Sequence, residues 1–318
     1  MTRNEVLNSI TLKKRFCKDC NIPINIFDEP YFSERLAILD SQFNCIDKFD
    51  VFCEELECFN NEQCYFEYYN SIKDSVIRMI KENTSFSAFL EDKFDDVRLI
   101  KYSIDVGNNN LYIDENNGKT FISLDMKKAN FSALKHYSSS IFKETETWED
   151  YIGLFTNSEH IKNSKYIRQV ILGACNPKKQ TQYEYYLMAL LYLHMKELLG
   201  DDIEVFSIGT DEIIISANNL ICSDERIKEV IDSCPNNIGS LIRFEKFDLH
   251  KIGEYGWMKS IYNNIGDKQV VFKGLNRDVY HQIVKHFLNK PIVENDLVFY
   301  YNGTLAKFLQ EVDNPWKE

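Results

Sequence analysis

The residues of this sequence best suited to chemistry are two aspartates, each placed directly after an apolar run. Asp125 ends the segment TFISLD, and Asp211 stands in VFSIGTDE with Glu212 beside it. A carboxylate at such a position is costly unless it faces solvent, a cation or a metal ion. Two converging carboxylates, together with phosphate oxygens, supply the ligands that Mg²⁺ requires. We therefore predict that Asp125 and Asp211 bind two Mg²⁺ ions, with Mn²⁺ as an alternative, and support phosphoryl transfer. Glu212 is either a further ligand or a charge at the turn.

The sequence around these aspartates predicts the strands that carry them and the helices that support the strands. Segment 120–125 is predicted to be a buried strand, and 203–216 to form two strands around a tight turn at Ile208–Asp211. Helical patterns cover 127–142, 160–173 and 181–199, with Gly173 and Gly200 as C-terminal caps. Helices packed behind one face of an antiparallel sheet make an α+β fold.

Composition separates the first third of the chain from the remainder. The 318 residues carry a net charge of −12, and their 44% hydrophobic content excludes extended disorder. Residues 1–100 hold 12 Lys and Arg against 19 Asp and Glu, and segment 71–82 has helical spacing. Turn-forming residues fill 105–120 around a short predicted strand at Leu111–Ile113. We therefore predict a mostly helical domain over 1–105, an α+β domain over 106–262 and a C-terminal region over 263–318.

Cysteine usage and hydropathy indicate a cytoplasmic protein. The nine cysteines are odd in number and widely spaced, which is typical of free, mostly buried thiols in a reducing compartment. Cys17 and Cys20 have the spacing of half a zinc site, but the later cysteines lack the spacing of a second half. No apolar run approaches the ~18 residues of a membrane span, so we expect no membrane partner. The frequent Asn, Lys and Ile residues favour a virus or a mobile element as the source.

Several segments resemble, in order, motifs of family-B DNA polymerases, in particular the protein-primed viral and organellar-plasmid subgroup. Segment 124–135, LDMKKANFSALK, resembles the first palm motif, and 205–212 resembles the Asp-Thr-Asp-Ser hairpin. Segment 165–173, KYIRQVILG, is similar to the fingers helix, in which a glycine follows a lysine by eight residues. Segments 258–262 and 271–274 resemble elements that contact primer–template, and 275–293 resembles the start of a thumb.

The resemblance implies a template-directed DNA polymerase with a palm, small fingers and a thumb-like C-terminal region over 263–318. Asp125 and Asp211 fall on the metal-binding aspartates of the family. Eight further positions acquire expected roles: Lys165, Arg168, Asn130 and Met126 in nucleotide binding, and Lys259, Tyr262, Lys273 and Gly274 in nucleic-acid binding. The implied partners are primer–template, nucleoside triphosphates and, through residues 1–105, other replication proteins.

Departures from the family pattern keep other functions open. Gly209 stands where the family has the first hairpin aspartate, Glu212 where it has serine, and Asn130 where it has the sugar-discriminating tyrosine. Segments 124–129 and 173–177 also resemble palm motifs of reverse transcriptases, and nucleotidyl cyclases share the Asp-Glu hairpin. A catalytically degenerate palm that binds nucleic acid or a replication protein is the non-enzymatic alternative.

The distribution of charge limits how such a protein would hold nucleic acid. A net charge of −12 excludes a protein that coats duplex DNA tightly. However, residues 243–290 carry nine Lys and Arg against five Asp and Glu. We therefore expect modest, salt-sensitive binding of nucleic acid by this segment.

Overall fold

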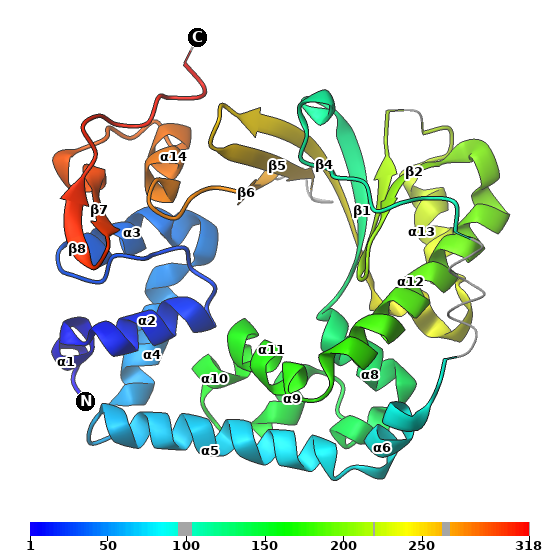
Figure 1. Cartoon of the computed structure of the whole chain (residues 1–318), viewed down its shortest axis with the longest axis horizontal. Helices are drawn as coiled ribbons and strands as arrows, with labels where there is room; N and C mark the ends of the chain where they lie inside the picture. Colours follow the sequence, from blue (N-terminus) through cyan, green and yellow to red (C-terminus); the bar gives the residue numbers. More distant parts are fainter. Residues whose placement is uncertain (95–103, 219, 263–267, 318) are drawn as a thin grey trace.

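A computed structural model describes residues 1–94, 104–218, 220–262 and 268–317, and these form an α+β fold, as predicted. A six-stranded sheet has the order β2-β3-β1-β4-β5-β6, and every neighbouring pair is antiparallel (Figure 1). Its strands are β1 (Thr120–Met126), β2 (Glu204–Ile208), β3 (Glu212–Ser216), β4 (Ile242–Ile252), β5 (Gly256–Tyr262) and β6 (Lys268–Lys273). The first aspartate strand therefore lies at the centre of the sheet, directly beside the predicted hairpin.

The N-terminal segment is helical, in agreement with its sequence pattern. Its helices are α1 (Arg3–Asn8), α2 (Ile10–Asp19), α3 (Tyr31–Phe43), α4 (Cys45–Leu56), α5 (Glu62–Lys81) and α6 (Thr84–Glu91). The longest of them is α5, and its N-cap residue is Asn61, whose side chain accepts a hydrogen bond from the Cys64 N–H. This helix buries one apolar stripe that includes Ile72, Val76 and Ile80. Figure 1 shows α5 at the end of the molecule opposite the sheet.

The remaining helices follow the N-terminal segment in the chain, and several differ from the prediction in their ends. They are α8 (Ala129–Tyr137), α9 (Trp148–Gly153), α10 (Glu159–Asn163), α11 (Lys165–Gly173), α12 (Pro177–Leu199), α13 (Asp224–Asp232) and α14 (Tyr280–Phe287). The single helix predicted over 160–173 is wrong, because Ser164 adopts an extended conformation and its hydroxyl caps a new helix at the Ile167 N–H.

Two predicted helix boundaries and one predicted strand also need correction. The helix predicted over 127–142 ends at Tyr137, and a 3₁₀ turn follows at 139–142. The helix predicted from 181 begins at Pro177, because Asn176 caps it and proline suits its first turn. No strand forms at Leu111–Ile113, where bends lead into a 3₁₀ turn at 114–116.

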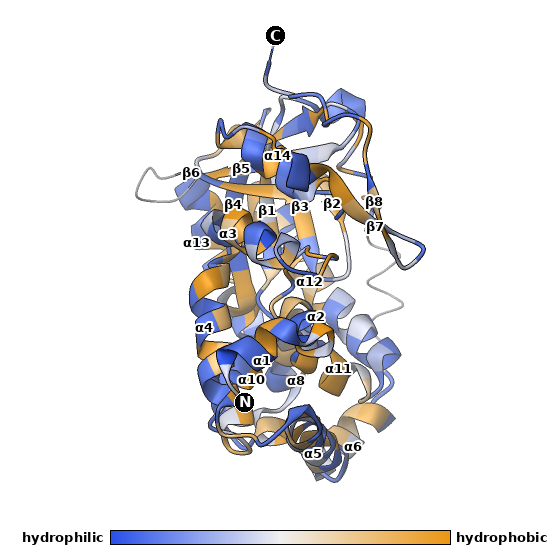
Figure 2. Cartoon of the chain, turned by 90° about the vertical axis from the view of Figure 1, so that its left-hand side faces the viewer, coloured by the Kyte–Doolittle hydropathy of each residue, from blue (hydrophilic) through white to orange (hydrophobic). Residues whose placement is uncertain are grey.

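The two faces of the sheet have different surroundings. Ile122, Leu124 and Met126 of β1 belong to the main core with the helices, among which α12 contacts β3. The alternate residue Phe121 joins a second, smaller cluster on the other face, with Leu111, Ile214, Phe247, Leu249, Trp257 and Ile261. Side chains two residues apart on a strand share a face, so Ser123 and Asp125 lie on this second face. Figure 2 shows the apolar residues of the strands and of the helices beside them.

The C-terminal segment is fastened to the N-terminal helices by buried charges. Asp296, which is 1% exposed, receives an ion pair from Arg35 of α3 and another from Lys285 of α14. Beyond it, β7 (Val298–Tyr301) and β8 (Thr304–Lys307) form a separate hairpin. The main core runs from Val6 to Val284, and thus across both predicted domain boundaries. The division at 105 and 262 stays a prediction.

Two further sequence expectations concern membranes and thiols. Within the parts of the chain that the structure describes, no helix is both long and apolar enough to cross a bilayer. All nine cysteines are free, and five of them are buried. Burial raises the pKa of the Cys17 thiol well above its usual value, which disfavours the thiolate form that binds zinc.

Candidate functional site

The two aspartates predicted from sequence line one pocket of about 620 Å³. Asp125 at the end of β1 pairs with Glu212, the first residue of β3, so Asp211 in the turn before β3 lies beside it. The Met126 N–H donates to the Asp211 carbonyl oxygen at 2.8 Å, and the Gly209 N–H donates to the Glu212 carbonyl oxygen at 2.8 Å. These backbone bonds fix the turn against the strand, and both carboxylates therefore reach the same space.

The carboxylates in this pocket repel one another. Burial raises the pKa of Asp125, Arg243 opposes this effect, and the charges of Glu212 and Asp211 raise the pKa further. Burial and the charge of Glu212 also raise the pKa of Asp211, against a lowering contribution from Lys165. A cation bound between Asp125 and Asp211 would offset this repulsion.

Helix α11 supplies cationic side chains to the same pocket. Lys165 begins the helix and Arg168 follows it by three residues, so both lie on one side of α11 and line the pocket. Burial lowers the pKa of Arg168, and its Nε is buried with no hydrogen-bond partner among the described residues. An unpaired buried donor of this kind is unfavourable unless a ligand accepts from it.

The loop between β1 and α8 closes the pocket on a third side. Lys127, Lys128 and Asn130 line it, and Lys128 adopts a left-handed conformation with φ of 48° at the N-cap of α8. Lys128 forms an ion pair with Glu149, and Asn130 Oδ1 accepts from the Phe131 N–H at 3.0 Å. The Met126 side chain is 2% exposed and packs in the core, so this residue borders the pocket from within the sheet.

Glu212 lies beside the pocket and does not line it. Its Oε1 accepts from the Ser123 hydroxyl at 2.5 Å and lies 4.0 Å from Lys259 Nζ. Lys259 is 8% exposed, and its ammonium lies 4.2 Å from the centre of the Phe247 ring. Burial lowers the pKa of Lys259, and the charge of Glu212 partly opposes this. Glu212 is therefore held by polar groups on the second face of the sheet, the face that carries Ser123 and Asp125.

The structure brings together only part of the predicted nucleic-acid set. Lys273 of β6 lies directly opposite Trp257 of β5, and Trp257 is two residues from Lys259. Lys259 and Lys273 therefore share the second face of the sheet. Gly274 follows Lys273 with φ of 73° and is exposed. In contrast, Tyr262 lies three residues from Lys259, on the opposite face at the end of β5, where its hydroxyl donates to Asp248.

Sequence reasoning gave no role to six residues that line the pocket, namely Lys127, Lys128, Ala129, Gln169, Glu184 and Arg243. Arg243 of β4 donates to Asp125 Oδ2 at 2.7 Å, and its Nε lies 3.3 Å from Glu245. Glu184 of α12 is 8% exposed, and burial together with the charge of Asp211 raises its pKa to about 7. Glu184 is one of only two acids within the very apolar helix α12, and this was its signal, whereas nothing in the sequence pairs Arg243 with Asp125.

The donor set fits a hard divalent cation, although it is small. Within the described ranges, no three or more His, Cys, Asp or Glu side chains are grouped so as to hold a metal. Mg²⁺, however, needs only one or two carboxylates, because waters and substrate phosphates complete its coordination. Asp125 and Asp211 meet that need, with the competing Arg243 on Asp125 Oδ2.

Comparison with known proteins gave no relationship: no family model, no curated protein and no solved structure matches the chain. The resemblance to family-B polymerases therefore stays a prediction, and the function must be argued from the pocket itself.

Proposed function

We propose that this chain is a template-directed nucleotidyltransferase, most simply a DNA polymerase, whose reaction takes place in the pocket between β1, the β2–β3 turn and α11. One observation carries the proposal. Asp125 and Asp211 line the same cavity of about 620 Å³ as Lys165 and Arg168. Carboxylates and cations around one space suit a triphosphate that arrives with a divalent cation.

Asp125 and Asp211 would hold the Mg²⁺ ions, and Mn²⁺ could replace them. When bound, these ions neutralise phosphate charge and favour the ionised form of the attacking hydroxyl. Lys165 and Arg168 would bind the β- and γ-phosphates, which satisfies the unpartnered Nε of Arg168. The α8 N-terminus at Lys128–Asn130 adds first-turn N–H groups that favour phosphate oxygens.

The proposed reaction is displacement at phosphorus. The 3′-hydroxyl of a primer attacks the α-phosphate of the nucleotide, the new P–O bond forms, and the bond to the β-phosphate breaks to release pyrophosphate. The chain contributes position and charge rather than a covalent intermediate. Lys259 and Lys273, which share the second face of the sheet, would contact the phosphate backbone of the primer–template.

Primer extension tests this proposal. Purified protein is incubated with labelled dNTPs or rNTPs, with and without primer–template, in Mg²⁺ or Mn²⁺, and the products are separated on a gel. We expect extension that requires primer and template and that is lost in Asp125→Asn and Asp211→Asn. Asp201→Asn removes an exposed carboxylate from the turn after α12 and is the matched control.

The outcomes separate the alternatives. Extension at the wild-type rate by Asp211→Asn would refute the site assignment. Extension only on an RNA template would favour a reverse transcriptase, and turnover of a triphosphate without primer would favour a nucleotidyl cyclase.

One observation favours a second candidate, a palm that binds nucleic acid without catalysis. The ion pair between Arg243 and Asp125, at 2.7 Å, neutralises one of the two acids that a catalytic metal requires. Calorimetric titration with Mg²⁺, with and without a nucleotide, distinguishes the two. Nucleotide-dependent metal binding supports the enzyme, and its absence together with binding of nucleic acid supports the binding module.

A further inference from the structure

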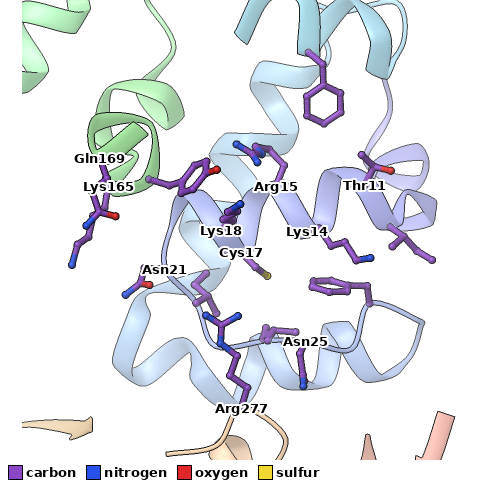
Figure 3. Close-up of a pocket in the computed structure, with 16 residues that line it drawn as sticks. Thr11, Lys14, Arg15, Cys17, Lys18, Asn21, Asn25, Lys165, Gln169 and Arg277 are labelled. Carbon is purple, nitrogen blue, oxygen red and sulfur yellow. The ribbon is translucent and has the colours of Figure 1, made fainter. Parts of the chain in front are cut away.

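A second cavity, of about 670 Å³, adjoins the pocket that Asp125 and Asp211 line, which we name the acidic pocket after these two aspartates. Helix α2, the segment 21–27 that follows it, α11 and Arg277 line this space, as Figure 3 shows. Lys165 and Gln169 of α11 line both cavities. The two cavities are therefore neighbours that meet at Lys165 and Gln169 of helix α11. We name the second space the basic cavity.

The charge of the basic cavity is of one sign. Five cations line it, namely Lys14, Arg15, Lys18, Lys165 and Arg277, and none of its lining residues is an Asp or a Glu. Within the described parts of the chain, only Arg15 has a carboxylate within ion-pair distance, that of Asp19 at 3.7 Å. Four cations thus face one space without a carboxylate partner. Such a concentration of positive charge favours an anionic ligand.

This charge contrasts with the composition of the segment that supplies it. Residues 1–100 carry 19 Asp and Glu against 12 Lys and Arg, yet Lys14, Arg15 and Lys18 gather on one side of α2. Residues at spacings of three and four lie on the same face of a helix. The described acids of this segment do not line the cavity, so the local potential opposes the net charge of −12.

Aromatic rings lie among these cations. Lys18 Nζ lies 4.2 Å from the ring centre of Tyr166, and Arg15 lies 4.8 Å from the same ring. Lys14 Nζ lies 5.7 Å from the ring centre of Phe27, which also lines the cavity. Cations interleaved with aromatic rings are typical of surfaces that bind single-stranded nucleic acid, because cations contact phosphates while rings stack on bases.

The walls of the basic cavity are held together by buried polar contacts. Asp19, at the end of α2 and 0% exposed, accepts from Tyr69 of α5 at 2.9 Å and from the Ser164 cap of α11 at 3.0 Å. On the other side, Asn25 donates to Asp278, the neighbour of Arg277. The cations are therefore placed before any ligand binds, which lowers the entropic cost of binding.

We propose that the basic cavity binds the phosphodiester backbone of a single nucleic-acid strand, the unpaired strand that continues beyond the acidic pocket. This inference rests on the proposed function for its direction, because a template strand must leave the site of nucleotide addition. The shared residues Lys165 and Gln169 provide that continuity.

Fluorescence anisotropy of labelled oligo-dT of about 20 nucleotides, a length that exceeds the ~4–16 nucleotides typical of one single-strand site, tests the binding. The variant Lys14→Gln/Lys18→Gln/Arg277→Gln removes three cations that have no carboxylate partner among the described residues, so the fold should persist. We expect a Kd at least tenfold higher than that of the wild type. The slope of log Kd against log salt should fall by about 0.7 for each phosphate that the variant no longer neutralises.

A matched control removes three exposed cations elsewhere, through Lys81→Gln/Lys178→Gln/Arg226→Gln. Both triple variants lose the same net charge, so a difference between them reports the cavity and not the overall field. Circular dichroism melting confirms that each variant is folded. Equal Kd values for the cavity variant and the control would overturn the inference, as would an absence of oligonucleotide binding by the wild type.

Two further arms identify the ligand and separate this inference from the proposed function. Tripolyphosphate is added as a competitor at the same phosphate concentration as the oligonucleotide. If it displaces the oligonucleotide, the ligand is a small anion and the strand-binding inference is overturned. If the wild type extends primers while the cavity variant keeps its Kd, this inference fails and the proposed function stands. If the cavity variant loses binding while the wild type extends no primer, the inference stands and the proposed function fails.

Discussion

The buried ion pair between His160 and Asp19 is expected to make the stability of this protein sensitive to alkaline pH. His160 Nε2 donates to Asp19 Oδ2 at 3.1 Å, and both side chains are almost fully buried. Burial alone lowers the pKa of His160, but hydrogen bonds with Asp19 and Cys20 and the charge of Asp19 outweigh it and raise the pKa to about 9. His160 is therefore protonated in the folded protein at neutral pH.

The direction and size of the effect follow from this shift. The folded-state pKa of about 9 exceeds the usual value of 6.5, so the stabilisation is complete below pH 6.5 and is lost as the pH rises through about 9. A difference of this size corresponds to about 3 kcal/mol of unfolding free energy. The other groups around the imidazole act differently: burial raises the pKa of Tyr69 far above this window, Arg15 stays cationic, and Glu55 accepts from the His160 backbone N–H.

Urea unfolding at pH 6.5, 7.5, 8.5 and 9.5, followed by circular dichroism, measures this loss. Burial raises the pKa of Cys45 to about 12 and of Cys53 to about 11, and these thiols also destabilise the fold at high pH. The comparison is therefore between the wild type and His160→Gln, in which only the imidazole is removed. Between pH 6.5 and 9.5 the wild type should lose about 3 kcal/mol more than the variant.

His194→Gln, at a histidine on α12 that bonds to a serine hydroxyl, is the control and should follow the wild-type pH dependence. If the unfolding free energies of the wild type and of His160→Gln fall in parallel with pH, the ion pair does not stabilise the fold and the reasoning is refuted.

Three other outcomes follow from named contacts. Asp296→Asn should cost about 3–5 kcal/mol in urea unfolding, because it leaves two buried cations unpaired; a loss below about 1 kcal/mol would contradict this. Gly256→Ala places a methyl group 2.5 Å from a carbonyl oxygen of β6 and should cost about 1–3 kcal/mol, whereas Gly173→Ala, with open space around it, should not. Arg243→Gln should tighten Mg²⁺ binding in calorimetry, because it removes a competitor for Asp125; unchanged or weaker binding would show that the arginine does not compete.

Local patterns in the sequence were sufficient to predict the elements that carry the aspartates. The apolar runs before Asp125 and Asp211 each become a strand of the six-stranded sheet: β1 is central and almost wholly buried, and β2 is an edge strand buried at its end. The break between α10 and α11 was missed, because the helical spacing of His160, Ile167 and Ile171, which are seven and four residues apart, continues across it. A serine that can cap a helix competes with that spacing, and only the tertiary hydrogen bond of Ser164 to Asp19 decides the outcome.

The candidate site was predictable only where its residues belong to such elements. The sequence placed Asp125 and Asp211 in one site because each follows an apolar run, and the resemblance to the fingers motif added Lys165; all three line one pocket in the structure. Arg243 was not predictable, since its contact with Asp125 depends on β4 lying beside β1 although 118 residues separate them. The basic cavity was missed for the same reason, because its cations come from α2, α11 and Arg277.

Helix α11 joins the two proposed binding functions. Its first residue, Lys165, lines both the acidic pocket and the basic cavity, and its cap Ser164 is hydrogen-bonded to Asp19 at the end of α2. The same carboxylate carries the ion pair with His160. The Asp19 carboxylate, which pairs with His160 in the core at neutral pH, therefore also fixes the start of α11 relative to the cations of α2. Because the cations of the basic cavity repel one another, the buried contacts of Asp19 help to keep them together for the single strand that we propose.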